Sequence, residues 1–170
     1  MTTQSIRVGV VGVGYLGAIH AQIYAAMAGV ELVGVTDIDV QAAARVAKEC
    51  GCSAYSESEA LLDKVDAVSV VVPTSSHRVV AEPYLRDGIH VLLEKPIADH
   101  LVDAKAIVKA AEETGTILQI GHLERFNAGV VRLVQELDRP RFIEVHRLGP
   151  FVSRAADVDV VTDLMIHDID

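Results

Sequence analysis

The residues of this sequence that could do chemistry are Lys95, in the tripeptide EKP, and a group of ionisable side chains near residue 170 that includes Asp163, His167 and Asp168. On a helix, Asp163 and His167 are four residues apart and share a face. An imidazole exchanges a proton near neutral pH, and an ammonium group stabilises negative charge that develops on an oxygen. These residue types therefore suit a reaction in which a proton leaves a hydroxyl group.

Each of these residues also has a plain structural interpretation. Lys95 fits a solvated lysine at the end of a strand, and Asp163 with His167 fits an i, i+4 ion pair on a helix surface. A metal site built from Asp163, His167 and Asp168 is the weaker alternative, because one helix supplies two ligands and no certain third. We therefore predict no metal ion.

A glycine-rich turn at residues 12–17 points to a dinucleotide. Gly12, Gly14 and Gly17 follow the apolar run 6–11 and have the G-x-G-x-x-G spacing. The first glycine permits a tight turn, the second lets a pyrophosphate approach the backbone, and the third lets the next helix pack closely. An ordinary glycine turn between a strand and a helix is the alternative. The predicted cofactor contacts in this turn are Gly12, Val13, Gly14, Tyr15, Leu16 and Gly17.

The helix after this turn is predicted to lie on the sheet with the face formed by Leu16, Ile19, Ile23 and Met27, which recur every three or four residues.

An acidic residue stands where a dinucleotide-binding unit needs one. A second predicted strand, residues 31–36, ends at Asp37, twenty residues beyond Gly17. Its carboxylate would accept hydrogen bonds from the adenosine ribose and repel a 2′-phosphate, which favours NAD over NADP. Asp39 competes for this role, but it is better placed to cap a helix over residues 40–50.

Strands and helices alternate along residues 6–121 in the manner of an α/β protein. Apolar runs predict strands at 6–11, 31–36, 54–55, 66–72, 90–93 and 117–120, with helices between them that include 40–50, 57–62 and 101–113. Six alternations predict a doubly wound parallel sheet with right-handed crossovers, which is a Rossmann fold. We assign residues 1–121 to this dinucleotide-binding domain.

The pattern changes near Gly121. A helix over 124–137, a strand over 141–148, a loop over 150–159 and a helix from residue 161 onward read as the start of an α+β domain with an open sheet. One strand cannot bury a sheet face unaided. We therefore expect residues 122–170 to begin a substrate-binding and oligomerisation domain that is truncated in this sequence.

Composition excludes several classes of partner. The net charge of −9 argues against nucleic acid and anionic membranes, and the sequence has no apolar run long enough to cross a bilayer, so we expect a cytoplasmic protein. Cys50 and Cys52 are predicted to be free thiols. Six of the ten arginines fall after residue 121, where they suit either an anionic substrate or surface ion pairs. They are Arg125, Arg132, Arg139, Arg141, Arg147 and Arg154.

The candidate residues converge on one edge of the predicted sheet. Ligands of parallel α/β sheets lie beyond the carboxyl ends of the strands. Residues 73–77 follow the fourth strand there, residues 94–96 follow the fifth, and the second domain would bring Asp163 and His167. The cofactor candidates in the two loops are Pro73, Thr74, His77, Glu94 and Lys95.

Five motifs together resemble one oxidoreductase family. They are GVGYLG, VVPTSSH, EKP, GHLERFN and DLMIHDID, and they span the chain. The family they resemble includes glucose–fructose oxidoreductase and inositol dehydrogenase. This resemblance implies that Lys95, Asp163 and His167 form the catalytic set, that the bond between Lys95 and Pro96 is cis, and that the longer protein is a homo-oligomer.

Within that family, the motifs GHLERFN, RLGPF and DVDVVTDLMIHDID resemble bacterial dehydrogenases that oxidise the 3-hydroxyl of UDP-N-acetylglucosamine or its uronate. The implied reaction passes hydride from a sugar carbon to the nicotinamide. His167 would be the base, Lys95 would stabilise the oxygen, and Asp163 would orient the pair. The predicted substrate contacts are Arg125, Asn127 and His167.

Two alternatives to this function remain open. The first is a dehydrogenase of a free polyol such as inositol, and the second is a non-catalytic NAD-binding module. Residues 1–170 alone are expected at most to bind the cofactor, because half of the substrate-binding wall is missing from this sequence.

Overall fold

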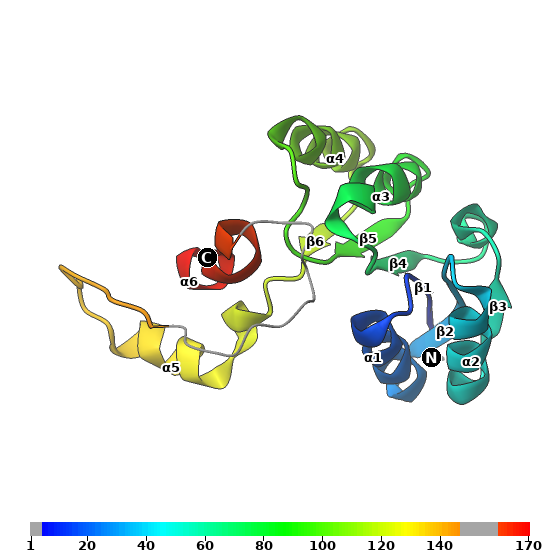
Figure 1. The fold of residues 1–170 in the computed structure, drawn as a ribbon, viewed down its shortest axis with the longest axis horizontal. Coiled ribbons are helices and arrows are strands. Elements are labelled where there is room, and N and C mark those ends of the chain that lie inside the picture. The colour runs from blue at the N-terminus through cyan, green and yellow to red at the C-terminus, as the bar shows by residue number, and fades with distance from the viewer. Residues whose placement is uncertain (1–4, 147–159) are drawn as a thin grey trace.

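A computed structural model describes residues 5–146 and 160–170, with only the backbone of Thr162 and Asp163. Within those residues, six strands form one parallel sheet in the order β3-β2-β1-β4-β5-β6 (Figure 1). This is the strand order of the Rossmann fold, so the predicted fold class is confirmed. The strands are β1 (Ile6–Val11), β2 (Val30–Thr36), β3 (Ser53–Tyr55), β4 (Ala67–Val70), β5 (His90–Leu93) and β6 (Leu118–Ile120).

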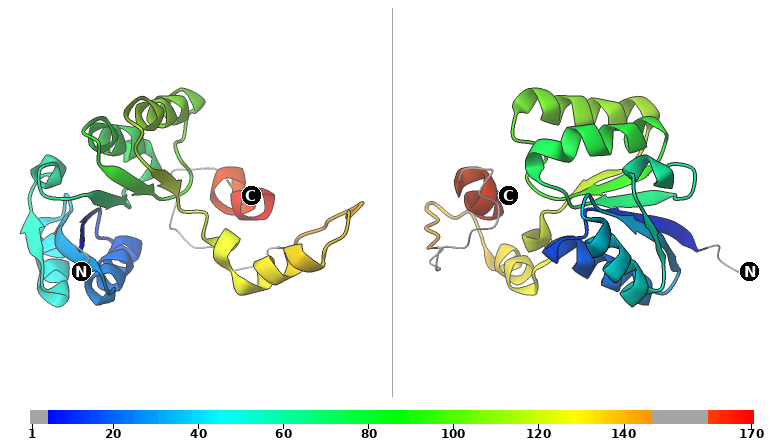
Figure 2. Two further views of the ribbon diagram at one scale, coloured as in Figure 1. Left: turned by 180° about the vertical axis from the view of Figure 1, so that it is seen from behind. Right: turned by 45° about the vertical axis from the view of Figure 1, so that its right-hand side comes forward.

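Helices cover both faces of the sheet, with α1 and α2 on one side and α3 and α4 on the other (Figure 2). Neighbouring residues of β1 serve the two faces: Val10 packs among residues of α1 and α2, and Val11 packs with the side that carries α3 and α4. Because both faces are covered, the strands read as continuous apolar runs. The helices in the described residues are α1 (Tyr15–Ala26), α2 (Val40–Cys50), α3 (His77–Arg86), α4 (Leu101–Thr114), α5 (Ala128–Glu136) and α6 (Ile166–Ile169). None of them is both long and apolar enough to cross a membrane.

Helix α1 does not bury the face that the sequence pattern predicts. Its buried residues are Gly17 and Ala21, whereas Leu16, Ile19 and Ile23 are between 37% and 51% exposed. The prediction was wrong because α1 approaches the sheet so closely that only small side chains fit beneath it. The larger apolar residues, Met27 included, are displaced to the outer side.

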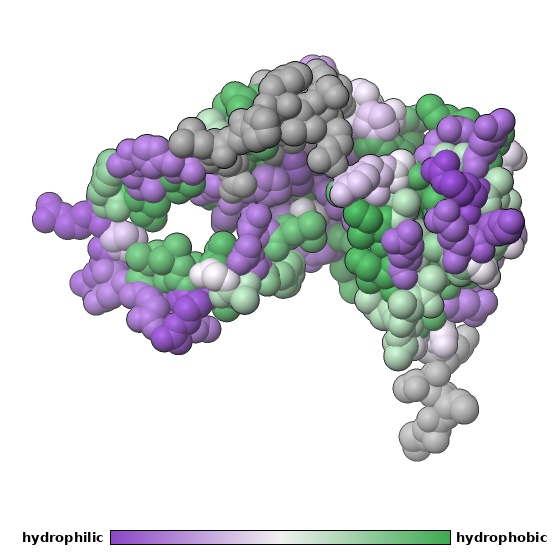
Figure 3. All heavy atoms as spheres, turned by 60° about the horizontal axis from the view of Figure 1, so that its bottom comes forward, coloured by the Kyte–Doolittle hydropathy of each residue, from purple (hydrophilic) through white to green (hydrophobic). Residues whose placement is uncertain are grey.

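The segment after β6 also departs from the prediction. Instead of one helix over 124–137, a short 3-10 helix (Leu123–Phe126) precedes α5, and Asn127 separates the two. Asn127 interrupts the helix because its side-chain oxygen accepts a hydrogen bond from the N–H of Gly129, as an N-cap does. No residue of α5 is buried. Apolar residues, green in Figure 3, lie exposed along the segment that contains α5.

The strand predicted over 141–148 is not formed at residues 141–146. A strand requires a neighbour whose backbone groups pair with it, and within the described residues every strand pairing belongs to the Rossmann sheet. Residues 147 and 148 and the loop predicted over 150–159 lie outside the described residues. The predicted domain boundary at residue 121 therefore stays a prediction.

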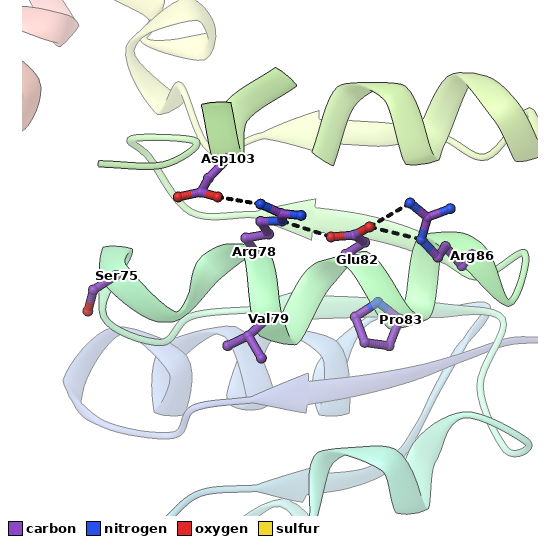
Figure 4. Close-up of a pocket in the computed structure, with 7 residues that line it drawn as sticks. All are labelled: Ser75, Arg78, Val79, Glu82, Pro83, Arg86 and Asp103. Carbon is purple, nitrogen blue, oxygen red and sulfur yellow. Dashed lines mark hydrogen bonds and ion pairs between the residues drawn. The ribbon is translucent and has the colours of Figure 1, made fainter. Parts of the chain in front are cut away.

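Helices α3 and α4 are linked by a chain of ion pairs (Figure 4). On α3, Glu82 binds both Arg78 at 3.0 Å and Arg86 at 2.6 Å, and Arg78 continues to Asp103 on α4 at 2.7 Å. The two hydrogen-bonding guanidinium groups lower the pKa of Glu82 from its usual 4.5. A carboxyl whose pKa is lower in the folded protein stabilises the fold above its unfolded pKa and loses that contribution as the pH falls.

Glu82→Gln is therefore expected to lower the free energy of unfolding near pH 7 by about 1 kcal/mol, since the arginines are half exposed and solvent screens the pairs. The difference from the unaltered protein should shrink as the pH falls below about 4.5. Urea unfolding at pH 7 and at acid pH measures both values. Glu112→Gln, which removes the same charge from an exposed position on α4, is the control. If Glu82→Gln lowered the free energy of unfolding equally at both pH values, the ion pairs of the Glu82 carboxylate would not be the source of its effect.

Candidate active site

The glycine turn between β1 and α1 has the shape that a pyrophosphate requires. Gly12 has φ +83°, and a Cβ there would lie 2.4 Å from the carbonyl oxygen of Val71. A Cβ on Gly17 would lie 1.8 Å from the carbonyl oxygen of Gly12, which is far inside van der Waals contact. A Cβ on Gly14, in contrast, would meet no atom within 4 Å. The open space above Gly14 is where a phosphate can approach the backbone.

Asp37 lies at the end of β2 beside this turn, where the sequence predicts a ribose contact. Its Oδ2 accepts a hydrogen bond from the N–H of Val13 at 2.7 Å, and its Oδ1 accepts one from the N–H of Asp39 at 2.9 Å. Two carboxylate oxygens keep further acceptor positions for ribose hydroxyls. Asp39 instead accepts hydrogen bonds from the N–H groups of Gln41 and Ala42 and caps α2, as predicted.

A cavity of about 440 Å³ joins the glycine turn, Asp37 and the loop after β4. Gly12, Gly14 and Asp37 line it together with Val72, Pro73 and Ser76. This cavity lies beyond the carboxyl ends of β1, β2 and β4, at the edge where α/β sheets bind their ligands. The residues present therefore fit a dinucleotide.

The loop after β4 contributes one exposed and two buried candidates. Pro73 is exposed and lines the cavity, and Thr74 is 8% exposed. His77 is 1% exposed and lies beneath the loop, with Nδ1 2.9 Å from the carbonyl oxygen of Pro96 and Nε2 3.0 Å from that of Val72. Both ring nitrogens thus contact the protein itself, which favours a structural role over the predicted contact with the cofactor.

The loop after β5 carries Glu94 and Lys95, and the bond between Lys95 and Pro96 is cis, as the resemblance implies. Glu94 is 7% exposed. Its Oε1 lies 3.3 Å from Nε2 of His20, and its Oε2 accepts a hydrogen bond from the N–H of Lys95 at 3.3 Å. Glu94 thus turns into the protein, and its predicted contact with the cofactor stays a prediction.

Sequence reasoning missed the buried network beneath Glu94. Nδ1 of His20 lies 2.8 Å from the hydroxyl oxygen of Ser69, so the ring on α1 joins β4 to the loop after β5. The available signal was a serine in the apolar strand run and a histidine in the apolar helix. Buried polar groups are nearly always hydrogen-bonded, so two of them in apolar elements indicate a shared network.

The remaining catalytic candidates lie on the last two helical segments. Residues 161–165 form a turn of π-helix that leads into α6. Helix α6 lies beside the segment that follows β6 in the views of Figures 1 and 2. Asp170 anchors α6 there: Arg125 binds it through Nε at 2.6 Å, and Nδ1 of His122 lies 3.8 Å away. His167 is half-buried on α6, and the side chain of Asp163 lies outside the described residues. Convergence of Lys95, Asp163 and His167 stays a prediction.

The two other predicted substrate contacts have structural partners. Arg125 pairs with Asp170, which lowers the pKa of that carboxyl, and Asn127 caps α5. Arg132 pairs with Glu136. Surface ion pairs thus account for two of the arginines after residue 121, while Arg147 and Arg154 lie outside the described residues.

Neither cysteine provides an alternative reactive centre. Cys50 and Cys52 are free thiols, as predicted, and burial raises the pKa of Cys52 to about 11, so this thiol is protonated at neutral pH. Among the side chains that the structure describes, no group of three or more histidine, cysteine or acidic residues is arranged to hold a metal ion.

Residues 6–122 match the GFO/IDH/MocA family, described as an oxidoreductase family with an NAD-binding Rossmann fold. UDP-N-acetylglucosamine 3-dehydrogenase of Acidithiobacillus ferrooxidans is 46% identical over 166 residues, which cover 97% of this chain and 52% of that protein. A solved structure of that enzyme, GnnA, has a TM-score of 0.90 at 45% identity and covers 97% of this chain and 54% of its own.

Two further proteins bear on substrate and cofactor. Inositol 2-dehydrogenase/D-chiro-inositol 3-dehydrogenase of Lacticaseibacillus casei is 31% identical over 177 residues, covering 97% of this chain and 51% of that protein. The structure of GenD2 from gentamicin A biosynthesis in complex with NAD has a TM-score of 0.85 at 27% identity and covers 99% of this chain and 53% of that one. These matches confirm the resemblance drawn from the five motifs and NAD as the cofactor. The chain spans about half the length of the curated relatives it matches.

Proposed function

The chain belongs to the GFO/IDH/MocA oxidoreductase family, and from that premise we propose that the full-length protein is an NAD-dependent dehydrogenase acting on the 3-hydroxyl of a UDP-N-acetylhexosamine. The observation that carries the substrate class is the 46% identity to a UDP-N-acetylglucosamine 3-dehydrogenase over 97% of this chain. The glycine turn, Asp37 and the adjoining cavity support the choice of cofactor.

When bound, NAD supplies the acceptor for a hydride that leaves the sugar carbon. The protein must remove the proton of the same hydroxyl group, because the carbon releases hydride only as its oxygen becomes a carbonyl. We assign this proton to a ring nitrogen of His167. Lys95 donates a hydrogen bond to the oxygen and stabilises its negative charge, and Asp163 orients the imidazole. Arg125 and Asn127 remain candidates for contact with the substrate.

We also propose that the full-length protein is cytoplasmic and forms a homo-oligomer. Two free thiols fit the reducing conditions of the cytoplasm. Exposed apolar residues on α1 and α5, among them Ile23 and Val134, favour burial against further protein in a homo-oligomer.

Initial rates with full-length protein test the substrate class. Reduction of NAD, followed by absorbance, is expected to give a kcat/KM for UDP-N-acetylglucosamine at least about 100-fold above that for myo-inositol, because a site built for a nucleotide diphosphate leaves polar groups unpaired with a free polyol. The 31% identity to an inositol dehydrogenase supports the opposite preference as the second candidate.

A higher kcat/KM for inositol would replace the proposed substrate. NAD binding without oxidation of any alcohol tested would instead indicate a non-catalytic module.

A further inference from the structure

His77, the first residue of α3, is a buried ionisable group that the proposed chemistry does not use. It is 1% exposed, and each ring nitrogen contacts a backbone carbonyl oxygen: Nδ1 that of Pro96 at 2.9 Å, and Nε2 that of Val72 at 3.0 Å. Val72 belongs to the loop after β4, and Pro96 belongs to the loop after β5. One side chain therefore connects two of the loops at the ligand-binding edge of the sheet.

The direction of these hydrogen bonds follows from chemistry. A carbonyl oxygen only accepts, so each ring nitrogen must carry a hydrogen to bind it. A neutral imidazole has one N–H and makes one of the two bonds, whereas the charged ring makes both. The contact with Pro96 requires the hydrogen on Nδ1 in either form.

The contact with Pro96 reaches the residue next to Lys95. Pro96 has no N–H, so its carbonyl is the backbone group through which this residue can be held. On the other side of Lys95, Glu94 continues the sheet through its N–H, which binds the carbonyl oxygen of Val70 at 3.1 Å. Lys95 is thus fixed between a strand hydrogen bond before it and the His77 contact after it.

We propose that His77 is a positioning residue for Lys95: by donating Nδ1–H to the carbonyl oxygen of Pro96, it sets the place of Lys95 relative to the loop after β4. This inference rests on the proposed function, in which Lys95 donates to the substrate oxygen. The loop after β4 lines the cofactor cavity at Val72 and Pro73, so the contact couples the position of Lys95 to the wall of that cavity.

Two amide substitutions separate the contact with Pro96 from the contact with Val72. His77→Asn places its amide near the position of Nδ1 and keeps a donor for Pro96, whereas His77→Gln places its amide near the position of Nε2, where its donor faces Val72 and not Pro96. In full-length protein, His77→Gln is expected to lower kcat for UDP-N-acetylglucosamine about 30-fold or more, because small displacements of a catalytic group are costly. The kcat of His77→Asn should stay within about fivefold of the value for the unaltered protein. In both variants, the KM for NAD should change by less than about threefold.

Stability is controlled with Leu85→Val, a loss of one methylene at a fully buried position of the same helix. If kcat follows the thermal midpoint across the three variants, or if both His77 variants lose activity equally, the role is merely structural and the proposal fails.

A measurement on the unaltered full-length protein covers the case in which His77→Gln does not fold. Long-range proton–nitrogen spectra report whether Nδ1 of His77 carries a hydrogen. A protonated Nδ1 supports the proposal, and a bare Nδ1 overturns it whatever the kinetics of the variants. If the unaltered protein oxidises no alcohol, the proposed function fails on that result, and the spectra still decide whether the His77 contact exists.

Discussion

Gly17→Ala is expected to remove NAD binding and to lower the free energy of unfolding by about 3 kcal/mol, the upper end of the cost of overpacking a core. The added Cβ would lie 1.8 Å from the carbonyl oxygen of Gly12, and the obstructing atom is backbone, which no rotamer change can move. Relief requires α1 to move away from the sheet, which displaces the turn that holds the pyrophosphate. Thermal unfolding and calorimetric titration of full-length protein with NAD measure both losses.

Gly14→Ala is the matched variant in the same turn. Its Cβ meets no protein atom within 4 Å, so stability should change little. Because that Cβ would occupy the space above the backbone where a phosphate approaches, affinity for NAD should fall about tenfold or more, the loss expected when one phosphate contact is broken. Unchanged NAD affinity in Gly14→Ala would mean that the pyrophosphate does not lie over this turn.

Lys95→Met is expected to reduce kcat by about 10²- to 10³-fold, the scale seen when a donor to a developing oxyanion is lost. Methionine keeps an unbranched side chain that is one atom shorter and removes the charge, so the change acts mainly on the ammonium group. Affinity for NAD should fall by no more than about tenfold, since the glycine turn and Asp37 stay intact. Single-turnover reduction of NAD, followed in the absorbance band of NADH, separates the chemical step from product release.

Lys105→Met, which removes the same charge from an exposed position on α4, should behave as the unaltered protein. A Lys95→Met enzyme with normal kcat would remove Lys95 from the catalytic set. It would also remove the reason for positioning this lysine through His77.

The residues that sequence reasoning identified correctly are those whose requirements are local. Gly12 is specified by its positive φ and by the nearby carbonyl oxygen of Val71, and Gly17 by the close approach of the carbonyl oxygen of Gly12, whereas Gly14 leaves open space above the backbone for a phosphate. Asp39 was identified as a helix cap because a capping side chain bonds to N–H groups two and three residues ahead. The parallel sheet followed from apolar runs, since strands buried on both faces leave no polar alternation.

Tertiary packing decided which way several side chains face. The face of α1 depends on how closely the helix approaches the sheet, and the periodicity of Leu16, Ile19 and Ile23 contains no information on that distance. Asn127 could continue a helix or cap one, and it became a cap where the chain leaves the sheet. The strand expected over 141–148 did not form at residues 141–146, because strand structure requires a hydrogen-bonded neighbour that a local pattern does not supply.

The amino-acid sequence by itself determined the order of elements, the glycine turn and the acidic residue beside it, because each depends on conformational or hydrogen-bonding demands within a short stretch of chain. Only the tertiary structure decided that His77 and His20 face inward, toward Pro96 and Glu94. These contacts join residues 19 and 74 positions apart. Residue type shows that a histidine can donate a hydrogen bond, but its acceptor is chosen by the packing of separate elements.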